Sequence, residues 1–219
     1  MRNLGRVLFL IIFSTSLISC VDDKNYSRAV YMLVDVSGTY VKEIHHATKI
    51  IQILVTKMDP GDTFMLGRID SDSFSEKDVI VNVTFDRRTS SANQQKIVTI
   101  KKVNQFAQHV KSSRYTDITG GVLQAIEYLN RSGAGRKTLI IFSDLQEEVR
   151  KNQFRNVKLK FNGIRVISIN VKKLASDSRD PRKYYKRLAY WEKRVKDGKG
   201  KWLVIAASEK GKILQLVMQ

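Results

Sequence analysis

The chain has 219 residues, of which 42% are hydrophobic, enough apolar material for one domain with a substantial core. Only two prolines and no low-complexity run occur, which argues against long disordered segments. The single cysteine, Cys20, excludes a disulfide within one copy of the chain. The formal net charge of +18 at pH 7 raises the question of an anionic partner.

The first twenty residues have the pattern of an export signal. Arg2 and Arg6 precede a short apolar stretch, and the sequence Leu-Ile-Ser-Cys ends at Cys20. This resembles the signal of bacterial lipoproteins, in which the cysteine receives a diacylglycerol and becomes the mature N-terminus. The alternatives are a secretory signal with an incidental cysteine and an uncleaved helix, but the apolar run is too short to span a membrane. The resemblance implies a signal peptide at 1–19, a lipidated Cys and short tether at 20–27, and one domain at 28–219.

The same resemblance places the protein in the cell envelope, held by a lipid anchor. Val21 stands where some enterobacterial lipoproteins carry the Asp that retains them in the inner membrane. This favours an outer membrane, with the protein facing the periplasm or the cell surface. A tether of about seven residues reaches at most roughly 25 Å, so the folded domain is expected close to its membrane.

Basic residues are concentrated in the last third of the chain. Positions 20–149 hold 17 Lys and Arg against 16 Asp and Glu, whereas positions 150–219 hold 20 against 5. Such a segment often indicates nucleic-acid binding, but an exported lipoprotein rarely meets nucleic acid. Anionic lipid head groups or an acidic protein surface are the expected partners, with a merely solvated basic face as the alternative.

Apolar patterning predicts alternating strands and helices after the tether. Nearly continuous apolar runs are typical of strands buried on both faces of a parallel sheet, whereas the run at 79–85 alternates as an edge strand of a hairpin does. The order predicts an α/β fold: a doubly wound, mostly parallel six-stranded sheet with one antiparallel edge strand and helices on both faces. In chain order the elements are strand 28–35, helix 41–58, strands 63–69 and 79–85, helices 92–110 and 120–130, strands 137–142 and 164–171, a helix capped by Asp180 that runs to 196, strand 202–207 and a short closing helix.

Polar side chains follow the ends of two predicted strands and precede one helix. Asp35, Ser37 and Thr39 come directly after the first strand, Thr116 precedes a helix, and Asp144 follows the fourth strand. In a doubly wound sheet, ligand sites form outside the carboxyl ends of the strands. These five side chains are hard oxygen donors without sulfur or imidazole, a set that suits Mg²⁺, Mn²⁺ or Ca²⁺ and not Zn²⁺.

With these residues in place, the chain resembles a von Willebrand factor type A domain with a metal-ion-dependent adhesion site. The family pattern is Asp-x-Ser-x-Ser, then a separate Thr, then a separate Asp, and the resemblance extends from about Arg28 to the end. It implies that the three hydroxyls bind the metal directly, that the two carboxylates act largely through water, and that a partner carboxylate completes the coordination. Two departures are Thr39, where Ser is commoner, and Leu145 after Asp144, where many members have Gly.

Each motif alone also has an ordinary structural explanation, as an Asx turn or a helix cap. The three together favour a membrane-anchored, metal-dependent protein-binding module of the adhesion or assembly type, with a metal-free scaffolding lipoprotein as the alternative. An enzyme is not expected, because no nucleophile with an activating base and no phosphate loop is found.

The topology also sorts the basic residues by the end of the sheet on which they lie. Lys158, Lys160, Lys199 and Lys201 precede strands and are expected at the anchor end, where they would contact anionic head groups. A second group follows strands and is expected on the rim of the metal site, where it would attract an acidic partner and speed association. This group comprises Arg150, Lys151, Lys172, Lys173 and Arg179.

Overall fold

The computed structural model describes residues 25–38, 40–71, 73–150 and 157–219. Cys20, Thr39 and Lys151, which the sequence singled out, lie outside the described residues. In chain order, the described elements are β1 (Arg28–Asp35), the 3₁₀ turn η1 (Tyr40–Glu43), α2 (Ile44–Lys57), β2 (Thr63–Ile69), η2 (Glu76–Asp78), β3 (Val79–Thr84), α3 (Thr89–His109), α4 (Ile118–Arg131), β4 (Arg136–Phe142), β5 (Arg165–Ile169), α5 (Ala175–Arg179), α6 (Arg182–Asp197), β6 (Lys201–Ile205) and α7 (Lys210–Met218).

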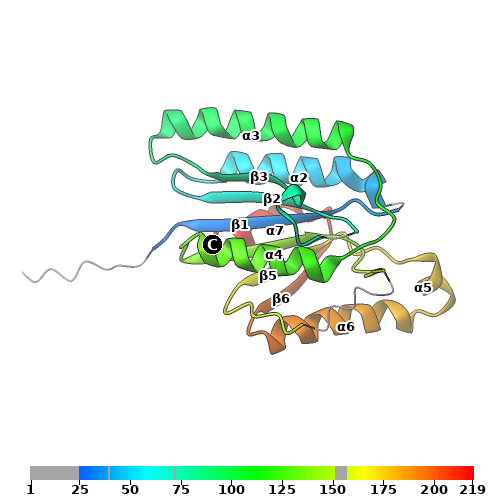
Figure 1. Cartoon of the computed structure of the whole chain (residues 1–219). Helices are drawn as coiled ribbons and strands as arrows, with labels where there is room; N and C mark the ends of the chain where they lie inside the picture. The colour runs from blue at the N-terminus through cyan, green and yellow to red at the C-terminus, as the bar shows by residue number, and fades with distance from the viewer. Residues whose placement is uncertain (1–24, 39, 72, 151–156) are drawn as a thin grey trace, which may run out of the picture.

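The strands form one six-stranded sheet in the order β3-β2-β1-β4-β5-β6 (Figure 1). β1 pairs in parallel with both β2 and β4, and β5 and β6 continue the parallel ladder. β3 pairs antiparallel with β2 at the edge. The predicted six-stranded, mostly parallel sheet with one antiparallel edge strand is therefore confirmed.

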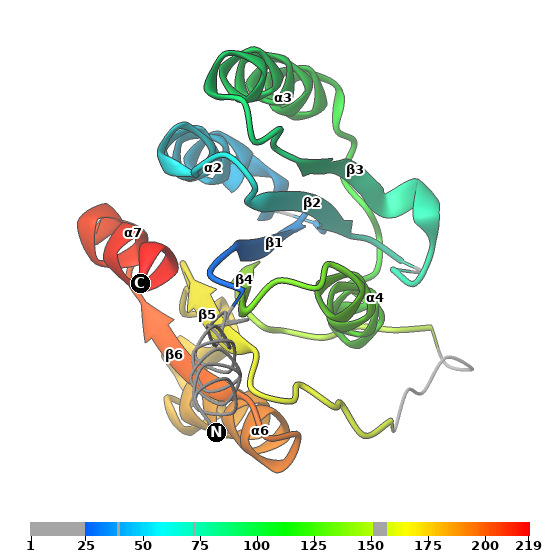
Figure 2. The same cartoon turned by 90° about the vertical axis from the view of Figure 1, so that its left-hand side faces the viewer.

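Helices cover both faces of this sheet, as Figure 2 shows along the strands. Alternate residues of β1 point to opposite faces, so Met32 joins a core under α2, α3 and α7, while Leu33 joins a core under α4 and α6. All eight residues of β1 are buried, which explains why its sequence is a nearly continuous apolar run.

The ends of several elements differ from the predicted ones by up to three residues, and the predicted helix 41–58 begins as the turn η1 before α2. Three further differences concern a short helix, a helix start and the tether. The short helix α5 was not predicted, because five residues carry too little periodicity to be recognised. α6 begins at Arg182, one residue later than Pro181, although the Asp180 carboxylate still accepts the Arg182 N–H at 3.2 Å. Residues 25–27, expected as tether, pack on the domain: the Asn25 side-chain amide donates to the Gly133 carbonyl at 2.7 Å.

Within the described ranges, no helix combines the length and the apolar character needed to cross a bilayer.

Candidate metal centre

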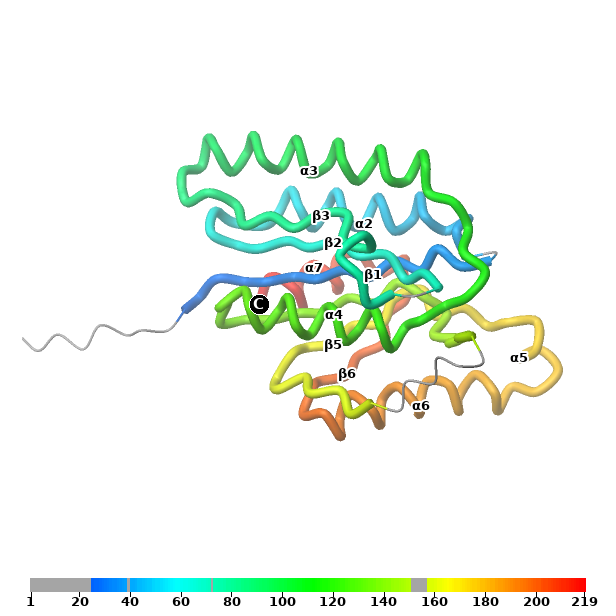
Figure 3. The backbone as a smooth tube through the Cα atoms, viewed as in Figure 1, coloured from blue at the N-terminus to red at the C-terminus, as the bar shows by residue number. Residues whose placement is uncertain are grey.

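The loop after β1, the segment before α4 and the loop after β4 gather at the end of the domain opposite the start of β1 (Figure 3). This end carries the carboxyl ends of the parallel strands. The sheet order places β1 between β2 and β4, at the point where the chain switches from one half of the sheet to the other. Crevices at such a switch point are the usual ligand sites of doubly wound folds.

Asp35, at the end of β1, is an enclosed acidic side chain, with 1% of its surface exposed. Its Oδ1 accepts hydrogen bonds from the Ser37 N–H at 2.8 Å and the Ser37 hydroxyl at 2.5 Å. Its Oδ2 accepts one from the buried Ser143 hydroxyl at 2.7 Å. The pKa of Asp35 is raised to about 6, mainly by burial and in part by the nearby Asp144 carboxyl, against the opposing effect of these hydrogen bonds.

Backbone hydrogen bonds to Ser113 hold the loop that carries Ser37. The Gly38 N–H donates to the Ser113 carbonyl at 3.0 Å, and the Ser113 N–H donates to the Val36 carbonyl at 2.9 Å. Gly38 has a φ of 42°, a conformation that glycine adopts readily. Thr39 follows directly, but its own position is outside the described residues.

Thr116 is buried at the same edge, and a two-residue bridge fixes its backbone. Its N–H donates to the Glu148 carbonyl at 2.7 Å, and the Glu148 N–H donates to the Thr116 carbonyl at 3.0 Å. The next residue, Asp117, caps α4 by accepting the Gly120 N–H at 2.7 Å. The segment before α4 and the loop after β4 are therefore fastened to each other.

Asp144 is half-buried, and burial raises the pKa of its carboxyl above the ordinary value. Leu145, which stands where the family often has Gly, has a φ of 65° and a buried side chain. This left-handed conformation is unusual for a bulky residue. Two side chains of α6 hold the loop in it: Arg187 Nε donates to the Asp144 carbonyl at 2.8 Å, and Trp191 Nε1 donates to the Leu145 carbonyl at 3.1 Å.

Sequence reasoning did not find the contributions of Ser143, Arg187 and Trp191. Ser143 directly precedes Asp144 in the sequence, so its position next to a predicted metal ligand could have identified it. Arg187 is only 9% exposed and forms a 2.8 Å ion pair with the buried Asp177. Trp191 is a core residue of α6, with 1% of its surface exposed. That these two side chains also hold a distant loop follows from tertiary packing alone.

The basic residues lie at both ends of the sheet. Arg150 stacks over the ring of Tyr115, beside Thr116, with its guanidinium carbon 5.6 Å from the ring centre, and Arg114 stacks on the same ring at 5.5 Å. Lys172 forms a 2.8 Å ion pair with Glu43, and the Lys173 ammonium lies 6.0 Å from the Tyr184 ring centre. The remaining residues are Arg179, which ends α5, and Lys158, Lys160 and Lys199, which line a cavity before β5 and β6 at the opposite end.

The candidate ligands at this edge carry hydroxyl and carboxylate oxygens. In the described part of the chain, no group of three or more His, Cys, Asp or Glu side chains is arranged as a metal site. His46 instead contacts Glu43 at 3.1 Å, and His109 contacts a carbonyl of its own helix. A hydroxyl that donates its proton to Asp35 keeps its oxygen lone pairs for another electrophile. The donor chemistry of the edge therefore fits a hard divalent cation.

Comparisons with known proteins support the fold. No protein-family model matches the chain, and a search of curated proteins found no match either. Among solved structures, an aerotolerance-related membrane protein from Bacteroides fragilis is 12% identical, with a TM-score of 0.53 over 88% of this chain and 98% of that one.

Two further structures show the same architecture. A von Willebrand factor type A protein from Catenulispora acidiphila is 12% identical, with a TM-score of 0.55 over 89% of this chain and 42% of that one. A mutant of the PilB minor pilin from Streptococcus sanguinis is 10% identical, with a TM-score of 0.56 over 90% and 62%. With these matches and the sheet order above, the chain has the von Willebrand factor type A fold.

Proposed function

We propose that this chain is a membrane-anchored binding module that captures a carboxylate of a partner protein through a divalent metal ion. Asp35, Ser37, Thr39, Thr116 and Asp144 would hold the ion, Mg²⁺ in the first instance, with Mn²⁺ or Ca²⁺ as alternatives. The observation that carries the proposal is the buried Asp35 carboxylate, which receives two serine hydroxyls at the switch point of the sheet.

The hydrogen bonds suggest different roles for the hydroxyl and carboxylate ligands in metal binding. The Ser37 hydroxyl donates its proton to Asp35, so the hydroxyl oxygen would be available to the metal. The negative charge of the Asp35 carboxylate would then compensate the charge of the ion without direct coordination. Neutral ligands leave the ion electrophilic, and Mg²⁺ keeps exchangeable water in its octahedral shell. A partner carboxylate would replace one such water. No nucleophile with an activating base is recognised among the residues that the structure describes, so binding and not catalysis is the proposed outcome.

The proposed anchor lies at the other end of the domain. β1 starts near the tether and ends at Asp35, so a lipidated Cys20 would direct the metal site away from the membrane. The lysines at the amino ends of β5 and β6 would face anionic head groups, each contributing about 1 kcal/mol near such a surface. Arg150, Lys151, Lys172, Lys173 and Arg179 would attract the acidic partner at the rim of the metal site. The Lys172 ion pair with Glu43 reduces its share of that attraction.

Metal-dependent stability tests the proposed site. Thermal unfolding of the mature protein should shift upward with Mg²⁺, because an ion that binds only the native state adds about 2.7 kcal/mol at 100 times its Kd. Asp35→Asn, which keeps the size of the side chain, should abolish the shift. The control Asp197→Asn makes the same change at an exposed residue of α6 and should retain the shift. Absence of any shift at millimolar Mg²⁺, Mn²⁺ and Ca²⁺ would favour the metal-free scaffold instead.

Affinity capture tests the partner. The lipidated protein should retain an acidic protein in Mg²⁺ and release it in a chelator, and Asp35→Asn should not retain it. Retention that is equal in the chelator would rule out capture through a metal.

Metabolic labelling with a fatty-acid analogue tests the anchor. Label should enter the wild-type protein and not Cys20→Ser. Equal labelling of the two proteins would refute lipidation at Cys20.

Association kinetics test the rim. The double change Arg150→Glu/Lys173→Glu should slow association with the captured partner and reduce its dependence on salt. Unchanged rates across a salt series would mean that these residues form a solvated face only.

A further inference from the structure

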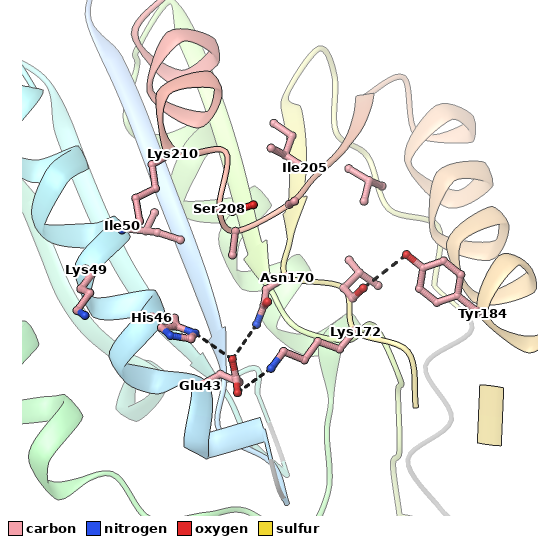
Figure 4. Close-up of a pocket in the computed structure, with 14 residues that line it drawn as sticks. Glu43, His46, Lys49, Ile50, Asn170, Lys172, Tyr184, Ile205, Ser208 and Lys210 are labelled. Carbon is pink, nitrogen blue, oxygen red and sulfur yellow. Dashed lines mark hydrogen bonds and ion pairs between the residues drawn. The ribbon is translucent and has the colours of Figure 1, made fainter. Parts of the chain in front are cut away.

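A cavity of about 640 Å³ lies beside the candidate metal site, outside the carboxyl ends of β5 and β6. Figure 4 shows the side chains that surround it, which come from η1, α2, the loop after β5, α6, the end of β6, the turn after it and the start of α7. Its volume is in the range of small-molecule sites, and it lies at the carboxyl edge of the sheet, the edge at which doubly wound folds bind ligands. Of the proposed metal ligands that the structure describes, Asp35, Ser37, Thr116 and Asp144, none lines it.

The walls of the cavity carry more positive than negative charge. Among the lining residues that the structure describes, Lys49, Lys172 and Lys210 contribute ammonium groups and Glu43 contributes the one carboxylate. Glu43 is already engaged by Lys172 at 2.8 Å, by His46 at 3.1 Å and by the Asn170 amide at 3.3 Å. These donors, Lys172 foremost, hold the pKa of Glu43 below its usual value. The negative charge of Glu43 is therefore already engaged by these contacts.

Two of the three ammonium groups remain available. Within the described part of the chain, no carboxylate forms an ion pair with Lys49 or Lys210. Both side chains are exposed, and they lie on α2 and at the start of α7, on either side of Ile50 in Figure 4. An anion in the cavity would therefore gain two cationic contacts without displacing an existing carboxylate.

The rest of the lining is apolar. Ile50 and Ile205 are buried beneath the opening, Val171 lies beside them, and Val204 is 41% exposed at the edge strand β6. The Tyr184 ring closes the side toward α6, with its hydroxyl 3.5 Å from the Val171 carbonyl. A ligand that occupies the cavity must match both an apolar floor and a cationic wall.

We propose that this cavity binds a small organic anion, namely a carboxylate or phosphate group carried on an apolar body. The acid group would lie between the ammonium groups of Lys49 and Lys210. The apolar body would cover Ile50 and Ile205 and approach the Tyr184 ring. Both parts contribute, since the exposed charges alone give weak, salt-screened contacts, while buried apolar surface adds about 25 cal/mol per Å².

Calorimetry or NMR titration in chelator-treated, metal-free buffer tests this site independently of the metal centre. Three probes separate the two contributions: phenyl phosphate carries both features, inorganic phosphate only the charge, and phenol only the ring. Phenyl phosphate should bind at least about tenfold more tightly than either of the others, and its affinity should fall as salt rises. Equal affinities of phenyl phosphate and inorganic phosphate would overturn the proposal.

Three variants locate the binding. Lys49→Gln/Lys210→Gln should weaken phenyl phosphate by about tenfold, whereas Lys57→Gln/Lys101→Gln removes the same charge from exposed positions outside the cavity and should leave the affinity unchanged. Ala207→Phe fills the cavity without changing charge and should abolish binding, with circular dichroism used to verify that the variant is folded. Equal weakening by both lysine pairs, or full binding to folded Ala207→Phe, would refute the assignment.

Discussion

The left-handed backbone of Leu145 predicts a reversal of the usual order of alanine and glycine substitutions. Leu145 has a φ of 65° and a side chain that is 1% exposed. Both Leu145→Ala and Leu145→Gly lose the buried side chain, at about 2–5 kcal/mol. Only glycine also releases the left-handed strain of about 1–2 kcal/mol, against an entropic cost of about 0.5–1 kcal/mol. Leu145→Gly should therefore be more stable than Leu145→Ala by up to about 1.5 kcal/mol.

Urea unfolding of the two variants measures this difference in stability. The slope of the unfolding free energy against urea concentration should be the same for both variants. Leu129 provides the matched control, because it is equally buried but lies inside α4 with ordinary helical geometry. There, the glycine variant should be less stable than the alanine variant by about 1 kcal/mol. If alanine is preferred at both positions by the same margin, the hydrogen bonds from α6 do not hold a strained loop, and the reasoning fails.

Burial raises the pKa of Asp78 above the ordinary 3.8, so the native state binds this proton more tightly than the unfolded state and loses stability as pH rises through that range. The free energy of unfolding of Asp78→Asn, relative to that of wild type, should therefore increase as the pH rises from pH 3 to pH 7 in parallel urea titrations. A difference in unfolding free energy that stays constant over this range would contradict this. Arg187→Met leaves the buried Asp177 without its ion-pair partner and should cost about 3–5 kcal/mol in urea unfolding. Ser143→Ala removes a hydroxyl from Asp35 and should weaken Mg²⁺ binding about tenfold or more by calorimetry, while the folded state persists.

The sheet could be predicted because its signal is local. β1 and β4 are nearly continuous apolar runs, and β3 alternates, so their places as buried and edge strands follow from burial on two faces or one. The candidate site benefits from the same logic, because Asp35 ends one strand, Asp144 follows another, and parallel strands end at one edge.

Features that depend on packing between distant segments could not be predicted. The sequence marks Leu145 as an unexpected residue, but only the contacts from Arg187 and Trp191 explain how a leucine holds a conformation that suits glycine. Likewise, Asn25 carries no sign that its amide reaches Gly133, more than a hundred residues away. The cavity beside β5 and β6 draws its lysines from α2, the loop after β5 and α7, so no single stretch of sequence contains its pattern.

The course of β1 has a mechanical consequence for the proposed anchored state. A pull between the membrane and a captured partner would enter at Arg28 and leave at Asp35, along one strand. β1 pairs with β2 over Ala29–Asp35 and with β4 over Arg28–Val34, both in parallel. Tension along its axis would strain these two ladders in shear, so many hydrogen bonds would resist together instead of opening one after another. The central strand would thus transmit force across the domain without passing it through a hinge.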